Sequence, residues 1–102
     1  MADYTVTITL SAGNFTYDPG YLKLHRGDRV RFSCNHAFTI KFSHGTPFQE
    51  KSGFSNDSAA TTDYEVIDSN ADRQAYHYMV AAIDGDNIIH MDSGCPTIEV
   101  VL

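Results

Sequence analysis

The sequence predicts a single all-β domain over residues 1–102, built as a sandwich or barrel of about seven short strands. Apolar and polar residues alternate with a period of two, and clusters of Gly, Asp, Asn and Pro separate the alternating segments. No stretch shows a convincing helical period. A chain of 102 residues that is 42% hydrophobic can fill one core without help from a metal or disulfides.

The first half of the chain contains four of the expected strands. In each one, apolar residues two positions apart face the core while polar residues face the other way. Gly27-Asp28 has the composition of a turn and separates the second strand from the third. The four inward rows are Val6, Ile8 and Leu10; Leu22 and Leu24; Val30, Phe32 and Cys34; and Phe38, Ile40 and Phe42.

The second half begins with a long polar segment at about residues 43–62, which we expect to be a functional or mobile loop. Asp84-Gly85-Asp86-Asn87 predicts a turn, because Gly and Asn tolerate positive φ. The remaining inward rows are Tyr64 and Val66; Tyr76, Tyr78 and Val80; and Ile98, Val100 and Leu102.

The charge balance indicates which partners to expect. Seven Lys and Arg residues against 13 Asp and Glu residues give a net charge of −6, which argues against nucleic acid as a partner. The N-terminus shows no signal-peptide pattern and no stretch is long and apolar enough for a membrane span, so we expect a cytoplasmic protein. Reduced thiols are then expected for Cys34 and Cys95.

The segment Phe15-Thr-Tyr-Asp-Pro-Gly-Tyr-Leu-Lys-Leu-His-Arg-Gly-Asp-Arg-Val-Arg-Phe32 resembles the opening of cupredoxins, the Greek-key sandwiches that include the blue-copper proteins. His36 precedes Phe38-Thr-Ile40, where that family places its first copper-ligating His. Tyr76-His-Tyr78-Met-Val80 resembles the Tyr-x-Tyr-x-Cys strand of the family. The resemblance implies a seven- to eight-stranded antiparallel Greek-key sandwich, cupredoxin-like or immunoglobulin-like. A late-strand Tyr is also typical of the tyrosine corner in such sandwiches.

The resemblance ends at Val80. A blue-copper centre needs a Cys thiolate there and a second His soon after, but this chain continues Val80-Ala81-Ala82-Ile83. The electron-transfer function of the family is therefore not expected, and we expect no cofactor. Asp18-Pro19 gives a further resemblance to the small bacterial DP-EP family, a cupredoxin-like group, although no Glu-Pro occurs; that family brings no known activity.

Two functions remain open. The outward row His77, Met79 and Ala81 is only partly polar, which predicts a non-enzymatic domain that binds another protein or associates with itself. The alternative is a non-blue copper or zinc site, because His, Met and Cys are ligands that these metals prefer. Its candidate ligands are His36, His90, Met91 and Cys95.

Overall fold

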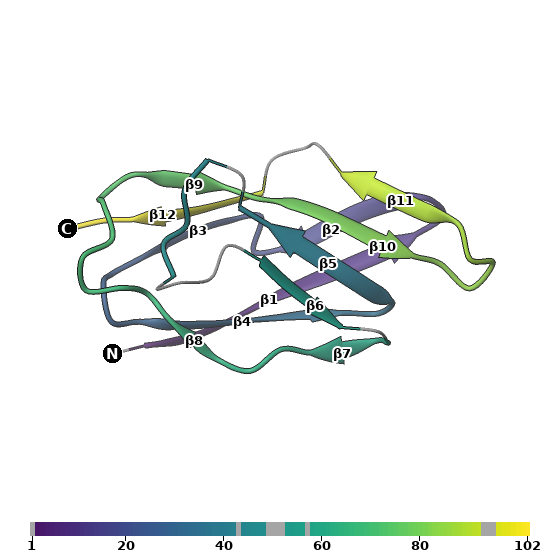
Figure 1. The fold of residues 1–102 in the computed structure, drawn as a ribbon, viewed down its shortest axis with the longest axis horizontal. Coiled ribbons are helices and arrows are strands. Elements are labelled where there is room, and N and C mark those ends of the chain that lie inside the picture. The colour runs from purple at the N-terminus through teal and green to yellow at the C-terminus, as the bar shows by residue number, and fades with distance from the viewer. Residues whose placement is uncertain (1, 43, 49–52, 57, 93–95) are drawn as a thin grey trace.

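The structure, a computed structural model, describes residues 2–42, 44–48, 53–56, 58–92 and 96–102. Within these residues the fold is all-β, with twelve short strands in an elongated molecule of 42 × 22 × 22 Å (Figure 1). The predicted all-β sandwich is therefore confirmed. None of the described segments forms a helix long and apolar enough to cross a membrane.

The first layer is a mixed sheet in the order β2-β1-β4-β7, with β8 also paired to β4. Alternation of threonines with Val6, Ile8 and Leu10 gives β1 one buried and one solvated face. The strands are β1 (Asp3–Ser11), β2 (Asn14–Asp18), β4 (Arg29–Cys34), β7 (Ala60–Thr61) and β8 (Glu65–Val66).

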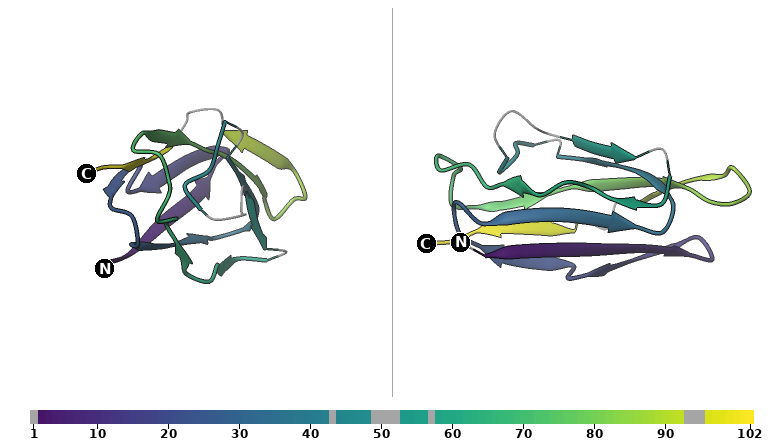
Figure 2. Two further views of the ribbon diagram at one scale, coloured as in Figure 1. Left: turned by 60° about the vertical axis from the view of Figure 1, so that its left-hand side comes forward. Right: turned by 90° about the horizontal axis from the view of Figure 1, so that it is seen from below.

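The opposite layer combines a four-stranded sheet, β11-β10-β5-β6, with a three-stranded sheet, β3-β12-β9 (Figure 2). Only Tyr78 separates β9 from β10, so one continuous run of chain joins the two sheets. The strands are β3 (Tyr21–Leu24), β5 (Ala37–Lys41), β6 (Gly53–Asn56), β9 (Ala75–His77), β10 (Met79–Ile83), β11 (Ile89–Asp92) and β12 (Thr97–Val100).

Two of the pairings differ from the expected antiparallel arrangement. β1 and β4 run parallel, with Val6 opposite Phe32, and β12 and β3 run parallel, with Ile98 opposite Leu22. After β2, which belongs to the first layer, the chain forms β3 in the opposite layer and then returns as β4 beside β1. A period of two places side chains on faces but does not specify which strand lies next to which.

The predicted aromatic core is confirmed. Phe32, Phe38, Phe42, Tyr76 and Tyr78 are all buried. The Tyr78 ring lies 5.1 Å from that of Phe42 and 5.5 Å from that of Phe32, so it contacts aromatic side chains from both layers. Cys34, predicted on the same face as Val30 and Phe32, is a buried free thiol, and burial raises its pKa.

Three details of the strand predictions were wrong. The supposed loop at 43–62 contains β6 and β7, and Phe54 of β6 is buried in the core. Val66 is 50% exposed while the next residue, Ile67, is fully buried. Leu102 lies beyond the end of β12 and is 85% exposed. Short strands carry too few residues for a period of two to fix the buried face.

Asp28 is a buried carboxylate in the turn between β3 and β4. It accepts hydrogen bonds from the backbone N–H groups of Ala2 and His25, both at 2.9 Å. Burial opposes its ionisation, but these hydrogen bonds outweigh burial and hold the pKa of Asp28 below its usual value. The ionised side chain therefore fastens the beginning of the described chain to the turn before β4.

Tyr76 forms the contact expected of a tyrosine corner. Its hydroxyl donates to the backbone oxygen of Asp72, four residues earlier, at 2.8 Å. The side chain is buried, and burial raises its pKa. This hydrogen bond ties the segment before β9 to the strand itself.

We expect Asp28→Asn to lower the free energy of unfolding by about 1–3 kcal/mol at pH 7, because one backbone N–H would face an amide N–H₂. The folded-state pKa is the lower one, so the contribution of Asp28 is complete above about pH 4 and is lost as the pH falls through the folded-state pKa. Urea unfolding of both proteins should show the difference shrinking in acid. A difference that does not change with pH would contradict this assignment.

We expect Tyr76→Phe to lower the free energy of unfolding by about 0.5–1.5 kcal/mol, because the Asp72 carbonyl loses its donor. The matched control is Tyr21→Phe. Tyr21 is 53% exposed and its hydroxyl binds the Glu99 carboxylate, so its loss should change stability by less than about 0.5 kcal/mol. Equal effects of the two substitutions in urea unfolding would rule out a special role for the corner.

Candidate functional site

Two of the four residues of the predicted metal site are consecutive in β11 and project to opposite faces of the sheet. Met91 points outward and is 69% exposed. His90 points toward the first layer, where a Cβ added to Gly13 would lie 3.7 Å from its ring. Strand geometry thus separates two ligands that the sequence pattern had grouped together.

The other two candidate ligands lie elsewhere. His36 is in the connection between β4 and β5 and is partly exposed, and Cys95 falls outside the described residues. Across the described ranges, no group of three or more His, Cys, Asp and Glu side chains is placed to hold a metal ion. The four-residue copper or zinc site stays a prediction, and the geometry of β11 gives it no added support.

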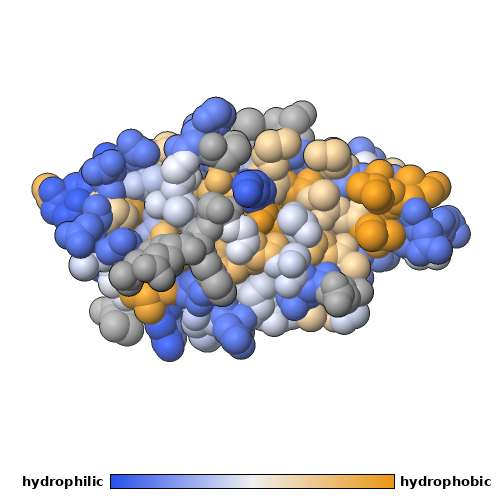
Figure 3. Space-filling model, viewed as in Figure 1, coloured by the Kyte–Doolittle hydropathy of each residue, from blue (hydrophilic) through white to orange (hydrophobic). Residues whose placement is uncertain are grey.

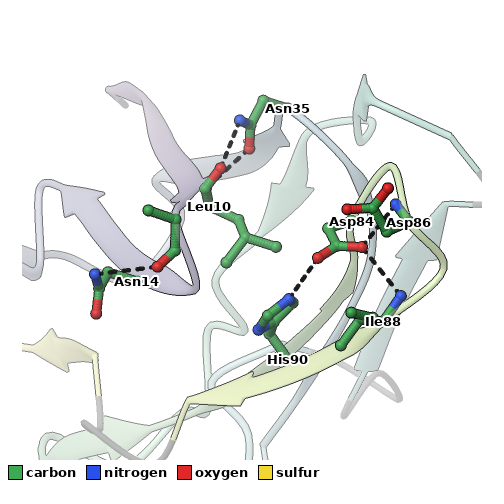
Figure 4. Close-up of polar contacts among 8 residues, drawn as sticks. Leu10, Asn14, Asn35, Asp84, Asp86, Ile88 and His90 are labelled. Atoms are coloured by element: carbon green, nitrogen blue, oxygen red, sulfur yellow. Dashed lines mark hydrogen bonds and ion pairs between the residues drawn. The ribbon is translucent and has the colours of Figure 1, made fainter.

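His90 instead pairs with Asp84 across the turn between β10 and β11 (Figure 4). Its Nε2 lies 2.8 Å from Oδ2 of Asp84. Oδ1 of Asp84 accepts the backbone N–H groups of Asp86 and Ile88, at 2.9 and 3.0 Å. The hydrogen bond with His90, followed by that from Ile88, holds the pKa of Asp84 below its usual value. Asn87 completes the turn with a φ of 61°, as its sequence predicted.

Tyr17 fastens β11 to the first layer. Its hydroxyl donates to the carboxylate of Asp92 at the end of β11, and burial together with this hydrogen bond raises the pKa of Tyr17. The inward side chains of β11 are therefore engaged with the turn and with β2. Its outward side chains, Ile89 and Met91, are left facing away from the sandwich.

The neighbouring connection at this end is also held by polar contacts. The Asn35 side chain accepts the backbone N–H of Leu10 at 2.9 Å and donates to its carbonyl at 3.0 Å (Figure 4). This pair ties the connection between β4 and β5 to β1. The polar side chains of Asp84, His90 and Asn35 therefore stabilise the connections at this end of the molecule. These connections in turn hold the neighbouring four-stranded sheet in place.

One surface, the outer face, is the solvent side of the four-stranded sheet. In its register Ile83 lies opposite Ile89 and Ala81 lies opposite Met91, so these apolar side chains are neighbours on one side. Ile83 is 42% and Ile89 64% exposed. Figure 3 shows hydrophobic side chains gathered at the end of the molecule where β10 and β11 meet. The outward positions are Met79, Ala81 and Ile83; Ile89 and Met91; Ala37, Thr39 and Lys41; and Gly53 and Ser55.

A shallow groove of about 380 Å³ runs over this face. It crosses from β11 to β6, with Ile83 and Ile89 at one side and Ser55 and Asn56 at the other. Ala37 and Ala81, small residues between larger ones, form part of its floor. The arrangement can receive apolar side chains of a partner, and Lys41 is the one charged residue among the ten outward positions named above.

The sequence identified part of this face. Met79 and Ala81 lie on it as predicted, whereas His77 belongs to β9 and bonds to Thr97 at 2.8 Å. Ile83 was missed although it continues the row of alternate residues. The predicted rows stopped at Val80 and Ala81, but Val80 is buried in mid-strand and β10 continues to Ile83. Ile89 was missed because nothing in the sequence indicates how β11 pairs.

Comparison with known proteins identifies a similar fold but no related family or curated protein. No family model matches the chain, and no curated protein matches it. Among solved structures, the chain is similar to a pseudoazurin from Sinorhizobium meliltoi, with a TM-score of 0.59 and 17% identity. The match covers 100% of this chain and 76% of the pseudoazurin. This likeness shows a cupredoxin-like fold and, at such low identity, the fold alone.

Proposed function

We propose that this cupredoxin-like domain is a non-enzymatic module that associates with a second copy of itself through the outer face. The observation that carries the proposal is the exposed row of Ile83, Ile89 and Met91 beside the groove of about 380 Å³. When a matching surface covers large apolar side chains on a sheet, these side chains lose contact with water. Their burial stabilises the complex by about 25 cal/mol per Å² of apolar surface removed from water.

The distribution of charge favours a second copy as the occupant. The whole chain has a net charge of −6, yet the ten outward positions include no carboxylate. Their one charged residue is Lys41, which is basic. Lys41 is opposite Met79 at one end of the face, while Asp86 lies in the turn beyond Ile83 at the other end. A two-fold axis that lies between the faces and across the strands would bring Lys41 near the partner's Asp86. Each copy then supplies both halves of the contact.

The size of the face indicates a weak dimer. Four strands spaced about 4.8 Å apart and five residues with a rise of about 3.4 Å give roughly 400 Å² once side-chain margins are included. A standard stable interface buries about 800 Å² on each partner. Net repulsion between two acidic chains acts in the same direction, although salt at about 0.15 M screens it beyond roughly 8 Å. We therefore expect a dissociation constant above about 10 μM.

Sedimentation equilibrium at about 0.15 M salt should show the wild-type mass rising toward twice the monomer mass as the protein approaches millimolar concentration. Ile89→Asp should keep the protein monomeric, because a carboxylate would then be buried at the contact. Val66→Asp is the matched control: Val66 is 50% exposed on β8, in the other layer, and its substitution should leave the dimer intact. A wild-type protein that stays monomeric throughout, or equal dimerisation by Ile89→Asp, would overturn self-association.

A charge exchange tests the orientation. Lys41→Glu and Asp86→Lys should each weaken the dimer about 2- to 5-fold, because each places like charges together. The double variant, and an equimolar mixture of the two single variants, should regain much of the wild-type affinity. Additive weakening in the double variant would reject the two-fold arrangement while leaving the apolar contact to be judged by Ile89→Asp.

A further inference from the structure

The solvent face of the first layer carries two arginines side by side on one strand. Arg29 and Arg31 are two positions apart in β4, so both project to the side opposite the buried Val30 and Phe32. They are two of the seven basic residues in a chain of net charge −6. β8 pairs with β4 here and places Val66, which is 50% exposed, opposite Arg29 (Figure 1).

One tyrosine holds both guanidinium groups. The Cζ atoms of Arg29 and Arg31 each lie over the Tyr64 ring, 4.7 Å from its centroid. A cation is attracted to an aromatic face, and the planar guanidinium stacks on it well. The ring therefore holds two long side chains in place. We call Arg29, Arg31, Tyr64 and Val66 the arginine face.

The charges on the arginine face are not balanced. Arg29 donates from Nε and Nη2 to the two carboxylate oxygens of Asp3, at 2.8 and 2.6 Å. Arg31 donates from Nε to the neutral hydroxyl of Thr5 at 2.9 Å. Among the described residues, its two Nη groups bind no carboxylate or other acceptor. Two guanidinium groups therefore share one carboxylate, and the surplus positive charge lies at Arg31.

The other carboxylates near the arginine face lie on a different surface or on a more distant strand. Asp63 and Glu65, which flank Tyr64 in sequence, line a separate groove of about 230 Å³ against β6. Asp18 projects from β2, with β1 between it and β4, which places it about 10 Å from β4. Salt at about 0.15 M screens charges that lie beyond roughly 8 Å. An anion at the arginine face would therefore meet mainly Arg31.

The geometry of the arginine face fits carboxylates on an extended chain. A guanidinium with free Nη groups can donate two parallel hydrogen bonds to one carboxylate. Arg29 and Arg31 are about 6.8 Å apart along β4, and the same spacing separates alternate side chains of an extended peptide. Tyr64 and Val66 add contact area beside them. Arg and Tyr are also the residue types that protein interfaces favour.

We propose that the arginine face binds an extended, acidic segment of a partner protein. One carboxylate of the segment accepts from the Nη groups of Arg31. A second carboxylate, two residues along, reaches Nη1 of Arg29, which Asp3 does not use. A second copy in this place would join two unlike surfaces and produce growing chains, so we assign a different protein. The site does not depend on the outer face or on self-association.

The test uses the whole domain, labelled with ¹⁵N, and two synthetic peptides that differ only in charge. The first alternates Thr and Glu over eight residues, and the second replaces each Glu by Gln. The Glu peptide should shift the amide signals of residues 29–33 and 64–66 with a dissociation constant of about 0.1–1 mM, and the Gln peptide should not bind. No binding of the Glu peptide at about 2 mM, equal binding of both, or shifts confined to other strands would overturn the proposal.

Two substitutions should change the affinity in opposite directions. Arg31→Gln should weaken the Glu peptide about 5-fold or more, because the guanidinium is lost. Asp3→Asn should strengthen it about 2- to 5-fold, because Arg29 becomes available to the peptide, and misfolding cannot produce such a gain. The matched control is Arg73→Gln: Arg73 is exposed before β9 and should not affect binding. An affinity that neither substitution changes, or that Asp3→Asn lowers, would reject the proposal.

Stability separates binding from a purely structural role of the stacked arginines. A structural role predicts that Arg31→Gln lowers the melting temperature and leaves the affinity for the Glu peptide unchanged. The proposal predicts the loss of affinity with a change in melting temperature below about 5 °C. Wild-type masses beyond the dimer in sedimentation, abolished by Arg31→Gln, would identify a second copy as the occupant and also reject the proposal.

A final pair of variants separates the arginine face from the outer face. Val66→Asp places a competing carboxylate opposite Arg29, so it should weaken the Glu peptide while leaving the dimer intact. Ile89→Asp should do the reverse, abolishing the dimer while binding the peptide like the wild type. Loss of peptide binding in Ile89→Asp, or wild-type peptide affinity in Val66→Asp, would contradict the assignment to the arginine face.

Discussion

The packing of Tyr78 between the two layers is the contact on which the rest of the arrangement depends. Its ring contacts Phe42 on its own side and Phe32 on β4, and its N–H bonds to the Pro96 carbonyl at 3.0 Å. Tyr78 also stands between β9 and β10, at the point where the chain passes from one sheet to the next. A fully buried aromatic ring fixes the register of this run, since a slip of one residue would bring Met79 inside.

The outer face is a consequence of that register. With Tyr78, Val80 and Ala82 directed inward, Met79, Ala81 and Ile83 must point outward, because successive side chains of a strand alternate. The same rule applies to β11, where two contacts hold the alternate residues inward: Asp84 with His90, and Tyr17 with Asp92. The polar pairs at this end are thus structural, and the apolar side chains of Ile83, Ile89 and Met91 are left exposed on the opposite face.

The two sides of β6 differ in character. The side toward β5 borders a groove whose lining residues carry no charge, and the other side borders a groove lined by Asp63 and Glu65. Lys41 lies on the same outer face as the first groove but at the opposite end of β5 from Ala37. A net charge of −6 is therefore unevenly spread over the chain: the outer face is spared and the seam between the layers is acidic. Composition alone suggested only that the surface as a whole would be acidic and unfit for phosphates.

The strand pattern was a good guide where strands are long and half-buried. The rows at Val30, Phe32 and Cys34 and at Phe38, Ile40 and Phe42 face the core as expected. Prediction failed for β6, a four-residue edge strand with one buried residue, Phe54, in an otherwise polar stretch. The sequence also grouped His90 and Met91 as ligands of one metal site, and this grouping is not supported. The two residues are consecutive in a strand, and successive side chains of a strand point to opposite faces.

The amino-acid sequence by itself determined the all-β class, the inward and outward rows of the longer strands, the turn at Asp84–Asn87 and the presence of Val80 rather than a Cys at the end of the row Tyr76, Tyr78 and Val80. These are local properties, since alternation, turn residues and side-chain chemistry act over a few positions. Tertiary structure alone decided that Ile83 and Ile89 meet, and that β6 lies across a seam from Asp63. Such neighbours depend on strand order and direction, which are set by how the whole chain packs around its aromatic core.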